Sequence, residues 1–468
     1  MIIWGVNNLN HDASLTVFDN NLHLFSSHSE RYSRVKNDTV LCNEILSKGL
    51  TYGKPDLILV SENNFKKKAR QLLTLDKRFF DSHKQFFSSR CVNSKIKFLD
   101  HHECHAAAAA FTSGFNRSLV FVFDSIGEFV TTSTWLLENN NIKLLHKINY
   151  PSSLGLFYSS FTKLLGLKPN EEEFILMGMA AHGEPKYFNE IMNLFEIEIP
   201  NFKLKKNLHK GISFNFKNKF DLASSVQAVF EYITILYVSY FKKRYNINNA
   251  CFSGGCALNC KANSNFLDFF DNVWIYPNSG DAGNSLGAVL NFTKLNFSYS
   301  PFLGEEVKTD IIPERVVDEI IKNKVVGLVH GKAEYGPRAL GNRSILADPR
   351  DSEIKIVLNR LKNRELFRPF APVILESNFL DCFTSKVSNS KFMTLVFKNK
   401  TDIKSIENVD RTSRVQTINS SDNKLLFDIL SEYYSRTGIP FLINTSLNVR
   451  GQPLVNTKYD ASFNFKVF

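Results

Sequence analysis

Two histidines one helical turn apart are the first residues in this sequence whose spacing indicates chemistry. In the run DHHECHAAAAA at 100–110, His101 and His105 stand four positions apart. On a helix this spacing puts both imidazoles on one face, where they can bind one metal ion. Asp124, which closes an apolar strand-like run, is the natural third ligand, and Asp281, set among glycines, is the natural fourth. By spacing alone, a packing or capping role fits the histidines equally well.

Further polar residues follow the first predicted strands. His11 and Asp12 stand at a strand end, where an imidazole with a pKa near neutrality can act as a general base or anchor a substrate. A polar run after the predicted hairpin is suited to phosphate capture and comprises Glu30, Arg31, Arg34 and Lys36. A surface turn and a solvated face explain these residues as well.

Two glycine-rich turns, GGCALN at 254–259 and GDAGNSLG at 280–287, each precede a predicted helix. Backbone N–H groups and helix N-termini at such turns bind phosphates. Neither turn is a P-loop or a dinucleotide fingerprint, so neither is specific alone, and together they predict a split nucleotide site. The candidate nucleotide-binding residues are Gly254, Gly255, Asn259, Gly280 and Gly283.

Basic residues gather among glycines, prolines and phenylalanines in the last third of the sequence. They lie in GPRALGNRS at 336–344, in the stretch 362–372, at Arg414 and at Arg450. Guanidinium groups match phosphate oxygens in bidentate pairs, so a phosphorylated small substrate is implied. Structural ion pairs can account for one or two of these residues but not for the ensemble.

The elements that must position these residues alternate between strand and helix. Strand-like runs at 2–6, 13–18 and 22–25 predict an opening hairpin, and buried strands are predicted at 56–60, 118–124 and 250–255, with a helix over 221–243. A less regular stretch at 298–312 precedes a predicted helix over 313–323 and a strand over 325–329, and no internal repeat is evident. We therefore predict an α/β protein with domains at residues 1–305 and 312–468.

Composition narrows the classes of protein that are compatible with the sequence. With 43% hydrophobic and 22% charged residues in 468, the chain is globular and not disordered. No signal sequence is evident and no apolar run approaches the ~20 residues of a membrane span, so we expect a cytoplasmic protein without a membrane partner. Seven scattered cysteines predict free thiols. A net charge of +11 predicts attraction to anions, and the basic clusters at 65–70 and 241–244 are suited to a phosphate backbone.

Taken in order, these motifs resemble the NodU/CmcH family of carbamoyltransferases over nearly the whole sequence. The matching stretches are 11–14, 30–31, 101–106, 153–156, 168–171, 177–178, 254–259, 280–283, 336–350, 367–372 and 444–451. The resemblance implies an N-terminal actin-like ATPase (RNase H-like) domain and a C-terminal YrdC-like α/β domain. It implies that the YrdC-like domain makes carbamoyl-adenylate from carbamoyl phosphate and ATP, and that the N-terminal domain passes the carbamoyl group to a hydroxyl.

The resemblance also implies a role for each candidate residue. The ligands of a divalent metal, Fe(II) in type, that holds the nucleotide phosphates are His101, His105, Asp124 and Asp281, and Mg²⁺ is also compatible. The acceptor-side catalytic residues are His11 and Lys36. The carbamoyl-phosphate site comprises Lys362, Arg368, Arg414 and Arg450, with Arg338, Arg343 and Asn444 in the matching motifs.

The acceptor is the least determined part of this prediction. The sequence departs from the family pattern at His28-Ser29, Ser125, Glu172 and Ile175, all in the N-terminal domain. The basic balance favours a polyanion, such as a hydroxymethylated base in nucleic acid. The alternatives are a sugar or an antibiotic-like small molecule as acceptor, a kinase on the same ATPase fold, and a nucleic-acid-binding module without chemistry. A homodimer is compatible with each of these alternatives.

Overall fold

The computed structural model describes residues 1–73, 81–90, 92 and 94–468, which form two compact units. Unit 1 comprises Met1–Ser33 and Asn37–Ser300, and unit 2 comprises Arg34–Lys36 and Pro301–Phe468. Both units mix helices and strands, which confirms the predicted α/β class. Cys91 lies outside the described residues, and the described cysteines are free: Cys42, Cys104, Cys251, Cys256, Cys260 and Cys382.

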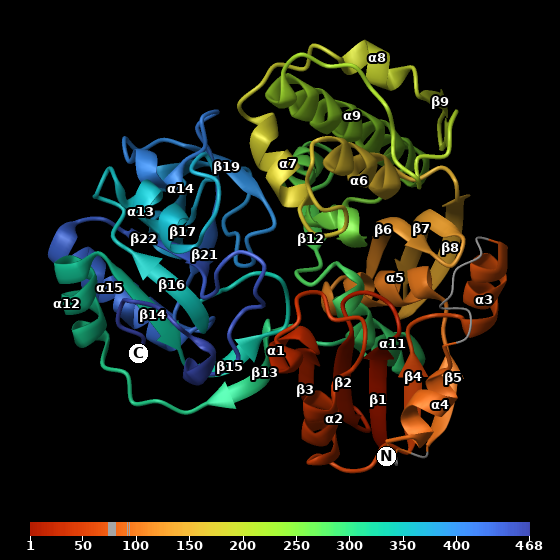
Figure 1. The fold of residues 1–468 in the computed structure, drawn as a ribbon, viewed down its shortest axis with the longest axis horizontal. Helices are drawn as coiled ribbons and strands as arrows, with labels where there is room; N and C mark the ends of the chain where they lie inside the picture. Colours follow the sequence, from red (N-terminus) through yellow and green to blue (C-terminus); the bar gives the residue numbers. More distant parts are fainter. Residues whose placement is uncertain (74–80, 91, 93) are drawn as a thin grey trace. The chain divides into compact units, whose positions relative to one another are not determined.

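Unit 1 contains one sheet topology twice (Figure 1). The strand orders are β3-β2-β1-β4-β5 and β12-β11-β6-β7-β8, and in each sheet three antiparallel strands continue into two parallel ones. This duplicated order is the RNase H-like arrangement of actin-like ATPases, as predicted. The strands are β1 (Ile2–Asn7), β2 (Ser14–Asp19), β3 (Leu22–His28), β4 (Leu57–Val60), β5 (Lys95–Phe98), β6 (Arg117–Gly127), β7 (Val130–Glu138), β8 (Asn141–Asn149), β11 (Asn249–Ser253) and β12 (Asn272–Ile275).

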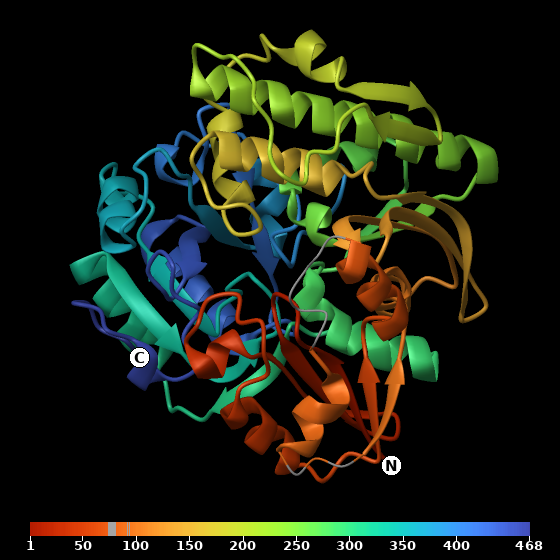
Figure 2. The same cartoon turned by 45° about the vertical axis from the view of Figure 1, so that its right-hand side comes forward.

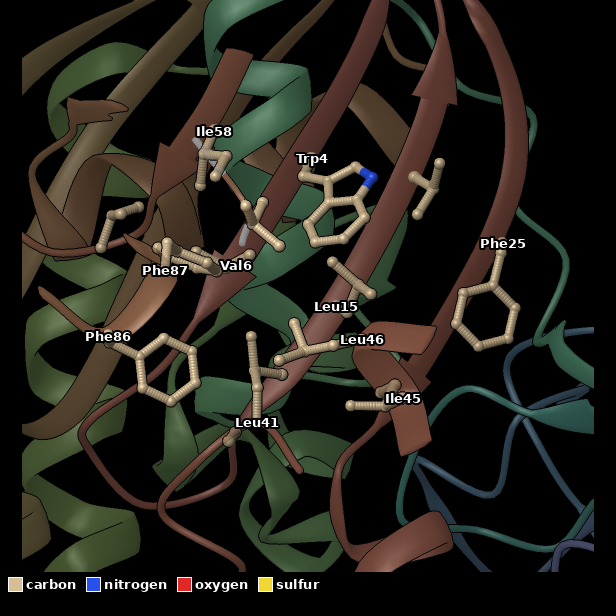
Figure 3. Close-up of a cluster of buried hydrophobic side chains, with 14 residues drawn as sticks. Trp4, Val6, Leu15, Phe25, Leu41, Ile45, Leu46, Ile58, Phe86 and Phe87 are labelled. Carbon is tan, nitrogen blue, oxygen red and sulfur yellow. The ribbon is translucent and has the colours of Figure 1, made fainter. Parts of the chain in front are cut away.

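An apolar cluster covers one face of the first sheet (Figure 3). Trp4 and Val6 of β1 lie on this face together, as side chains two positions apart on a strand must. Short helices α2 (Asn43–Leu50) and α4 (His83–Ser88) contribute further apolar side chains to the cluster. Because a slip of one residue would expose this cluster, its burial fixes where β1 ends and the loop carrying His11 begins.

Two helices, α5 (His101–Thr112) and α11 (Asn284–Thr293), pack against each other in unit 1. α5 also packs on β6 and β11, and α11 packs on β1 and β2. The approach is close, because a Cβ on Gly287 would lie 2.2 Å from the Cys104 carbonyl oxygen. The alanines at 106–110 are all buried and leave room for it. This packing holds the first turn of α5 near the turn that precedes α11.

The longest helix, α9 (Lys219–Tyr245), packs against α6, α7 and α8 (Figures 1 and 2). Against the expectation from sequence, it is long and apolar enough to cross a membrane, the one such helix among the described residues. Because 61% of its apolar window is buried inside the structure, we interpret it as a core helix. The remaining elements of unit 1 are α1 (Glu30–Ser33), α3 (Asn64–Leu73), α6 (Leu154–Leu164), α7 (Glu173–Ala180), α8 (Phe188–Met192), β9 (Phe195–Glu198), β10 (Asn201–Leu204) and α10 (Cys260–Asn265).

Unit 2 is built on a five-stranded sheet of order β14-β16-β22-β17-β21, antiparallel except between β17 and β21. The helix predicted over 313–323 and the strand predicted over 325–329 are confirmed as α12 and β14. The elements are β13 (Phe302–Val307), α12 (Pro313–Asn323), β14 (Val325–Val329), β15 (Gly331–Glu334), β16 (Arg343–Ala347), α13 (Ile354–Leu361), β17 (Ala371–Leu375), α14 (Phe379–Cys382), β18 (Phe383–Thr384), β19 (Val396–Asn399), β20 (Thr412–Arg414), β21 (Gln416–Ile418), α15 (Lys424–Thr437) and β22 (Phe441–Ser446).

Candidate metal centre and anion site

The structure brings together the four residues predicted to bind a metal. His101, His105, Asp124 and Asp281 are buried, and one ligand atom from each lies within 4.8 Å of the others. The two Nε2 atoms are 3.1 Å apart, and Asp281 Oδ1 lies 3.4 Å from each of them. Asp124 Oδ2 lies 3.4 Å from His101 Nε2. Ligand atoms held about 2.1 Å from one ion are roughly 3 to 4 Å apart, so these four residues fit a single metal ion.

The charges of the cluster also suit a cation. Burial by itself lowers the pKa of His101, but contact with Asp281 and Asp124 outweighs burial and raises that pKa well above its ordinary value. The same contacts lower the pKa of both carboxyl groups despite burial and their mutual repulsion. Two ionised carboxylates with two imidazoles form a nitrogen and oxygen donor set that suits Fe(II), Mn(II) or Zn(II).

Neighbouring backbone and hydroxyl groups orient these side chains. The Gly255 amide donates to Asp124 Oδ1 at 3.1 Å, and His105 Nδ1 lies 3.3 Å from Ser253 Oγ. Contacts of this kind fix a ligand's rotamer and tune its basicity. Ser253 was not predicted from the sequence, because only its place at the end of β11 connects it to the site.

His11 lies at the edge of the cluster. Its Nε2 is 3.4 Å from Asp281 Oδ2 and its Nδ1 is 3.1 Å from Asp12 Oδ2. Burial opposes protonation, but the carboxylates of Asp281 and Asp12 prevail and raise the pKa of His11 to about 10. A cation held by the same carboxylates would offset this attraction and return the imidazole toward neutral pKa. Lys36 belongs to unit 2, and its catalytic role stays a prediction.

The two glycine-rich turns are shaped by close contacts. Gly254 has φ +90°, and a Cβ there would lie 2.2 Å from the Phe123 carbonyl oxygen. Asn259 accepts a hydrogen bond from the Ala262 amide at 3.0 Å and so caps α10. Nucleotide binding therefore stays a prediction for these turns, since local structure alone accounts for both residues. The remaining candidates, Gly280 and Gly283, bracket Asp281 in the turn before α11.

Unit 2 gathers a separate set of buried cations. Burial, reinforced by nearby guanidinium groups, lowers the pKa of Lys362 well below its ordinary value and that of Arg364 to about 8. Burial likewise lowers the pKa of Arg368 to about 10, with Arg414 and Arg450 contributing. Like charges held this close are unfavourable unless an anion neutralises them.

Three buried polar atoms of unit 2, two from this cluster and one from Asn444 of β22, have no hydrogen-bond partner in the part of the chain that the structure describes. They are Arg364 Nη2, Arg414 Nε and Asn444 Oδ1. The Arg364 guanidinium lies over the Phe370 ring at 4.1 Å, and Asn444 donates to Gln416 Oε1 at 2.7 Å, so both side chains are fixed. Two free donors and one free acceptor complement a ligand that carries anionic oxygens and an amide. Arg364 was not singled out from the sequence, although it lies between Lys362 and Arg368.

The structure argues against the predicted role of Arg343. Its side chain is fully buried and donates to the backbone carbonyls of Asn456, His330 and Glu305 at 2.7 to 3.0 Å. These bonds occupy the N–H groups of the guanidinium, so Arg343 links separate segments of unit 2 and has no pair of free donors for a phosphate.

The other predicted anion-binding residues differ in what they can offer. Lys362 donates to the carbonyls of Ser446 and Asn448, so it shapes that turn and contributes charge more than free N–H groups. Arg450 donates to Glu365 Oε1 at 2.6 Å. Arg338 is half-buried in the loop before β16. Their roles in binding carbamoyl phosphate stay predictions.

Comparison with known proteins places the chain in a family. The family model of the carbamoyltransferase N-terminus matches residues 53–290, and that of the carbamoyltransferase C-terminus matches residues 317–467. The protein MJ1051 of Methanocaldococcus jannaschii is 31% identical, covering 97% of this chain and 95% of its own. The nodulation protein NolO of Bradyrhizobium diazoefficiens is also 31% identical, covering 78% of this chain and 76% of its own. The chain therefore belongs to the carbamoyltransferase family, as its resemblance to NodU-type O-carbamoyltransferases predicted.

Solved structures are more remote. Full-length HypF in its phosphate- and nucleotide-bound form is 13% identical, covers 63% of this chain and 55% of its own, and gives a TM-score of 0.41. A likeness this low supports no inference about function.

Proposed function

We propose that this carbamoyltransferase acts in two steps, one in each unit, on carbamoyl phosphate, ATP and a hydroxyl acceptor. In unit 2, water releases phosphate from carbamoyl phosphate, and the resulting carbamate attacks the α-phosphorus of ATP to form carbamoyl-adenylate and pyrophosphate. In unit 1, the acceptor oxygen attacks the carbamoyl carbon, and AMP leaves with the electron pair of the broken C–O bond. The acceptor proton passes to a base.

The observation that carries this proposal is the set of unsatisfied groups in unit 2. Among the described residues, Arg364 Nη2 and Arg414 Nε are free donors that suit the phosphate oxygens of a ligand. Asn444 Oδ1 is a free acceptor that suits the amide N–H of a ligand. Carbamoyl phosphate carries both kinds of group. Buried unpaired polar atoms are costly, so a ligand that satisfies them binds strongly.

Unit 1 offers the groups that the transfer step requires. The metal, when bound by His101, His105, Asp124 and Asp281, would supply positive charge for the nucleotide phosphates. His11 lies beside Asp281 at 3.4 Å, and once a bound cation has offset the pull of the carboxylates its neutral imidazole could take a proton from an incoming hydroxyl.

The products released from ATP test this proposal. We expect the purified protein, loaded with Fe(II), to release AMP and pyrophosphate only when carbamoyl phosphate is present. A kinase on the same fold would instead release ADP in the presence of its acceptor. The two-step proposal is overturned if carbamoyl phosphate leaves the release of pyrophosphate unchanged.

For the acceptor, we propose a polyanion, such as a hydroxymethylated base in nucleic acid. Support comes from the net charge of +11 and from the exposed lysines that follow β10. Lys205, Lys206, Lys210 and Lys217 are exposed, and no ion pair of theirs is found among the described residues. Unpaired exposed lysines can release counterions from a phosphate backbone.

Salt dependence distinguishes a nucleic-acid acceptor from a small one. We expect a fluorescent single-stranded DNA to bind at low salt, with a steep loss of affinity as salt increases. A variant with Lys205, Lys206 and Lys210 changed to Gln should bind more weakly and with a shallower salt slope. Undetectable binding at low salt would favour a sugar or an antibiotic-like small molecule, and carbamoylated products in extracts, identified by mass spectrometry, would then name it.

A further inference from the structure

The loop between β1 and β2 carries two side chains that contact Asp281 of the metal-type cluster, which comprises His101, His105, Asp124 and Asp281. Asn10 Nδ2 donates to Asp281 Oδ2 at 3.4 Å, and His11 Nε2 lies 3.4 Å from the same oxygen. The loop backbone is unusual, because Leu9 and Asp12 both have φ +60° without being glycine. Such conformations persist only where surrounding contacts hold them.

Side chains from elsewhere in unit 1 bind the carbonyl groups of this loop. His83 of α4 donates from Nε2 to the Asn8 carbonyl at 3.1 Å. Asn7 donates to the carbonyls of His11 and Asp12 at 3.0 and 3.1 Å.

Lys67 of α3 supplies the contact at the strained residue. Its Nζ donates to the Leu9 carbonyl at 3.0 Å and to Glu62 Oε2 at 2.6 Å. Both members of this ion pair are buried, with side chains 5% and 4% exposed. Because Lys67 is buried, it is not available to a phosphate backbone and drops out of the basic cluster predicted at 65–70, while the half-exposed Lys66 pairs with Asp100 at 2.8 Å. The side chain of Arg70 lies outside the described part of the chain.

A buried ion pair is poor evidence of a stability role. Removing two charges from water costs more than their attraction commonly returns, and apolar residues of similar size stabilise such a position as well or better. What an apolar residue cannot do is donate a hydrogen bond to the Leu9 carbonyl. Glu62, in turn, neutralises and orients the ammonium group that does so.

We infer that the buried pair Lys67–Glu62 positions the loop of residues 8–12, and through it Asn10 and His11, against Asp281 at the transfer site. Lys67 acts as a positioning residue, since it binds the loop backbone and touches no residue of the metal-type cluster itself. A shift of about 1 Å at a reacting group can cost about 100-fold in rate, so loss of this anchor is expected to slow transfer. The kinetic part of this inference rests on the proposed function.

Hydrogen exchange tests the inference without any assay of activity. Lys67→Met keeps the length of the side chain and removes its donor, so we expect faster deuterium uptake in a peptide covering residues 7–13. Uptake over α5, which carries His101 and His105, should stay as in the wild type. Lys67→Arg, which can still donate to the carbonyl and to Glu62, should restore protection in part. Unchanged uptake at 7–13 in Lys67→Met would overturn the inference.

Kinetics provide the second test, in metal-loaded protein. In a single turnover we expect Lys67→Met and Glu62→Gln to slow AMP release about 100-fold, while the rate of pyrophosphate release stays unchanged. Ile233→Val in α9 serves as the control, because it trims the buried core of unit 1 far along the chain from this loop. If the control slows AMP release as much as Lys67→Met does, general destabilisation explains the effect and positioning is rejected. Absence of pyrophosphate release from the wild type would count against the proposed function alone.

Discussion

The two units hold sites of opposite charge. In unit 1, ionised Asp124 and Asp281 face His101 and His105 within 4.8 Å, and the cluster attracts a cation. In unit 2, Lys362, Arg364 and Arg368 crowd together with depressed pKa values, and the cluster attracts an anion. In each case burial alone would make the charged groups less stable, so a ligand of opposite charge is the simplest reason for their arrangement.

The two sites also differ in the contacts that fix their side chains in place. The unit 1 cluster depends on tight backbone packing, since α5 and α11 approach so closely at Gly287 that a side chain there would clash. The unit 2 cluster depends on side-chain contacts, such as the Arg364 guanidinium over Phe370 and Lys362 on the Ser446 and Asn448 carbonyls. Changes in the two units should therefore impair different steps, and variants at His105 and Arg364 test that separation.

The largest effect is expected from removal of a ligand in unit 1. His105→Asn should reduce bound metal from about one ion per chain to traces and slow AMP release about 10³-fold or more. Pyrophosphate release in a single turnover should stay close to wild type, because His105 belongs to unit 1 alone. Metal content by mass spectrometry and quenched-flow kinetics measure the two. Equal loss of both steps would contradict the separation of sites.

In unit 2 we expect a smaller effect, and we expect it on pyrophosphate release. Arg364→Met keeps the packing on Phe370 but removes the free donor, so pyrophosphate release should fall about 100-fold. Metal content should not change. Arg343→Met is the matched comparison, since that guanidinium binds backbone carbonyls and its loss should lower the unfolding temperature instead. If Arg364→Met lowered stability without slowing the reaction, the assignment of an anion site would be wrong.

Part of this organisation could be predicted from the sequence. His101 and His105 lie on one helix, as predicted, and α12 and β14 have the predicted bounds, because strong periodicity and Pro313 mark them locally. The duplicated sheet could be predicted only from the resemblance to the carbamoyltransferase family, because strand order depends on tertiary pairing and no repeat is visible in the residues themselves.

Roles that depend on which side chains are buried could not be predicted from the sequence either. Arg343 and Arg364 look alike in a basic motif, yet one donates to backbone carbonyls and the other keeps a free N–H. In the sequence Lys67 looks like a surface lysine, but in the structure it is buried together with Glu62. The contacts that decide the roles of Arg343 and Lys67 are made to the distant carbonyls of Asn456 and Leu9, for which spacing in the sequence gives no signal.

The backbone at Gly254 allows a test of how unit 1 is held. Its φ of +90° and the 2.2 Å approach to the Phe123 carbonyl oxygen leave no space for a side chain. Gly254→Ala should therefore reduce the free energy of unfolding of unit 1 by about 3 kcal/mol. Gly166→Ala, which also has a positive φ but meets nothing within 4 Å, should cost only about 1 kcal/mol. Similar losses in urea unfolding of the two variants would rule out the close approach as the cause.

The smallest effect concerns Asp348, a carboxylate of unit 2 that we assign to neither site. Asp348 is buried and accepts from Arg350 Nη2 at 2.7 Å and from the Tyr433 hydroxyl at 2.8 Å, and these contacts overcome burial to lower its pKa from 3.8 to about 2. Because the folded state then binds the proton more weakly than the unfolded state, the stabilisation is complete above pH 4 and is lost as pH falls toward 2. With allowance for the partly exposed Arg350, it amounts to about 1 kcal/mol. Urea unfolding of wild type and Asp348→Asn from pH 6 to pH 2.5 measures it, and the difference between the two proteins should shrink as pH falls. A difference that stays constant with pH would show that shape, and not charge, is what Asp348 contributes.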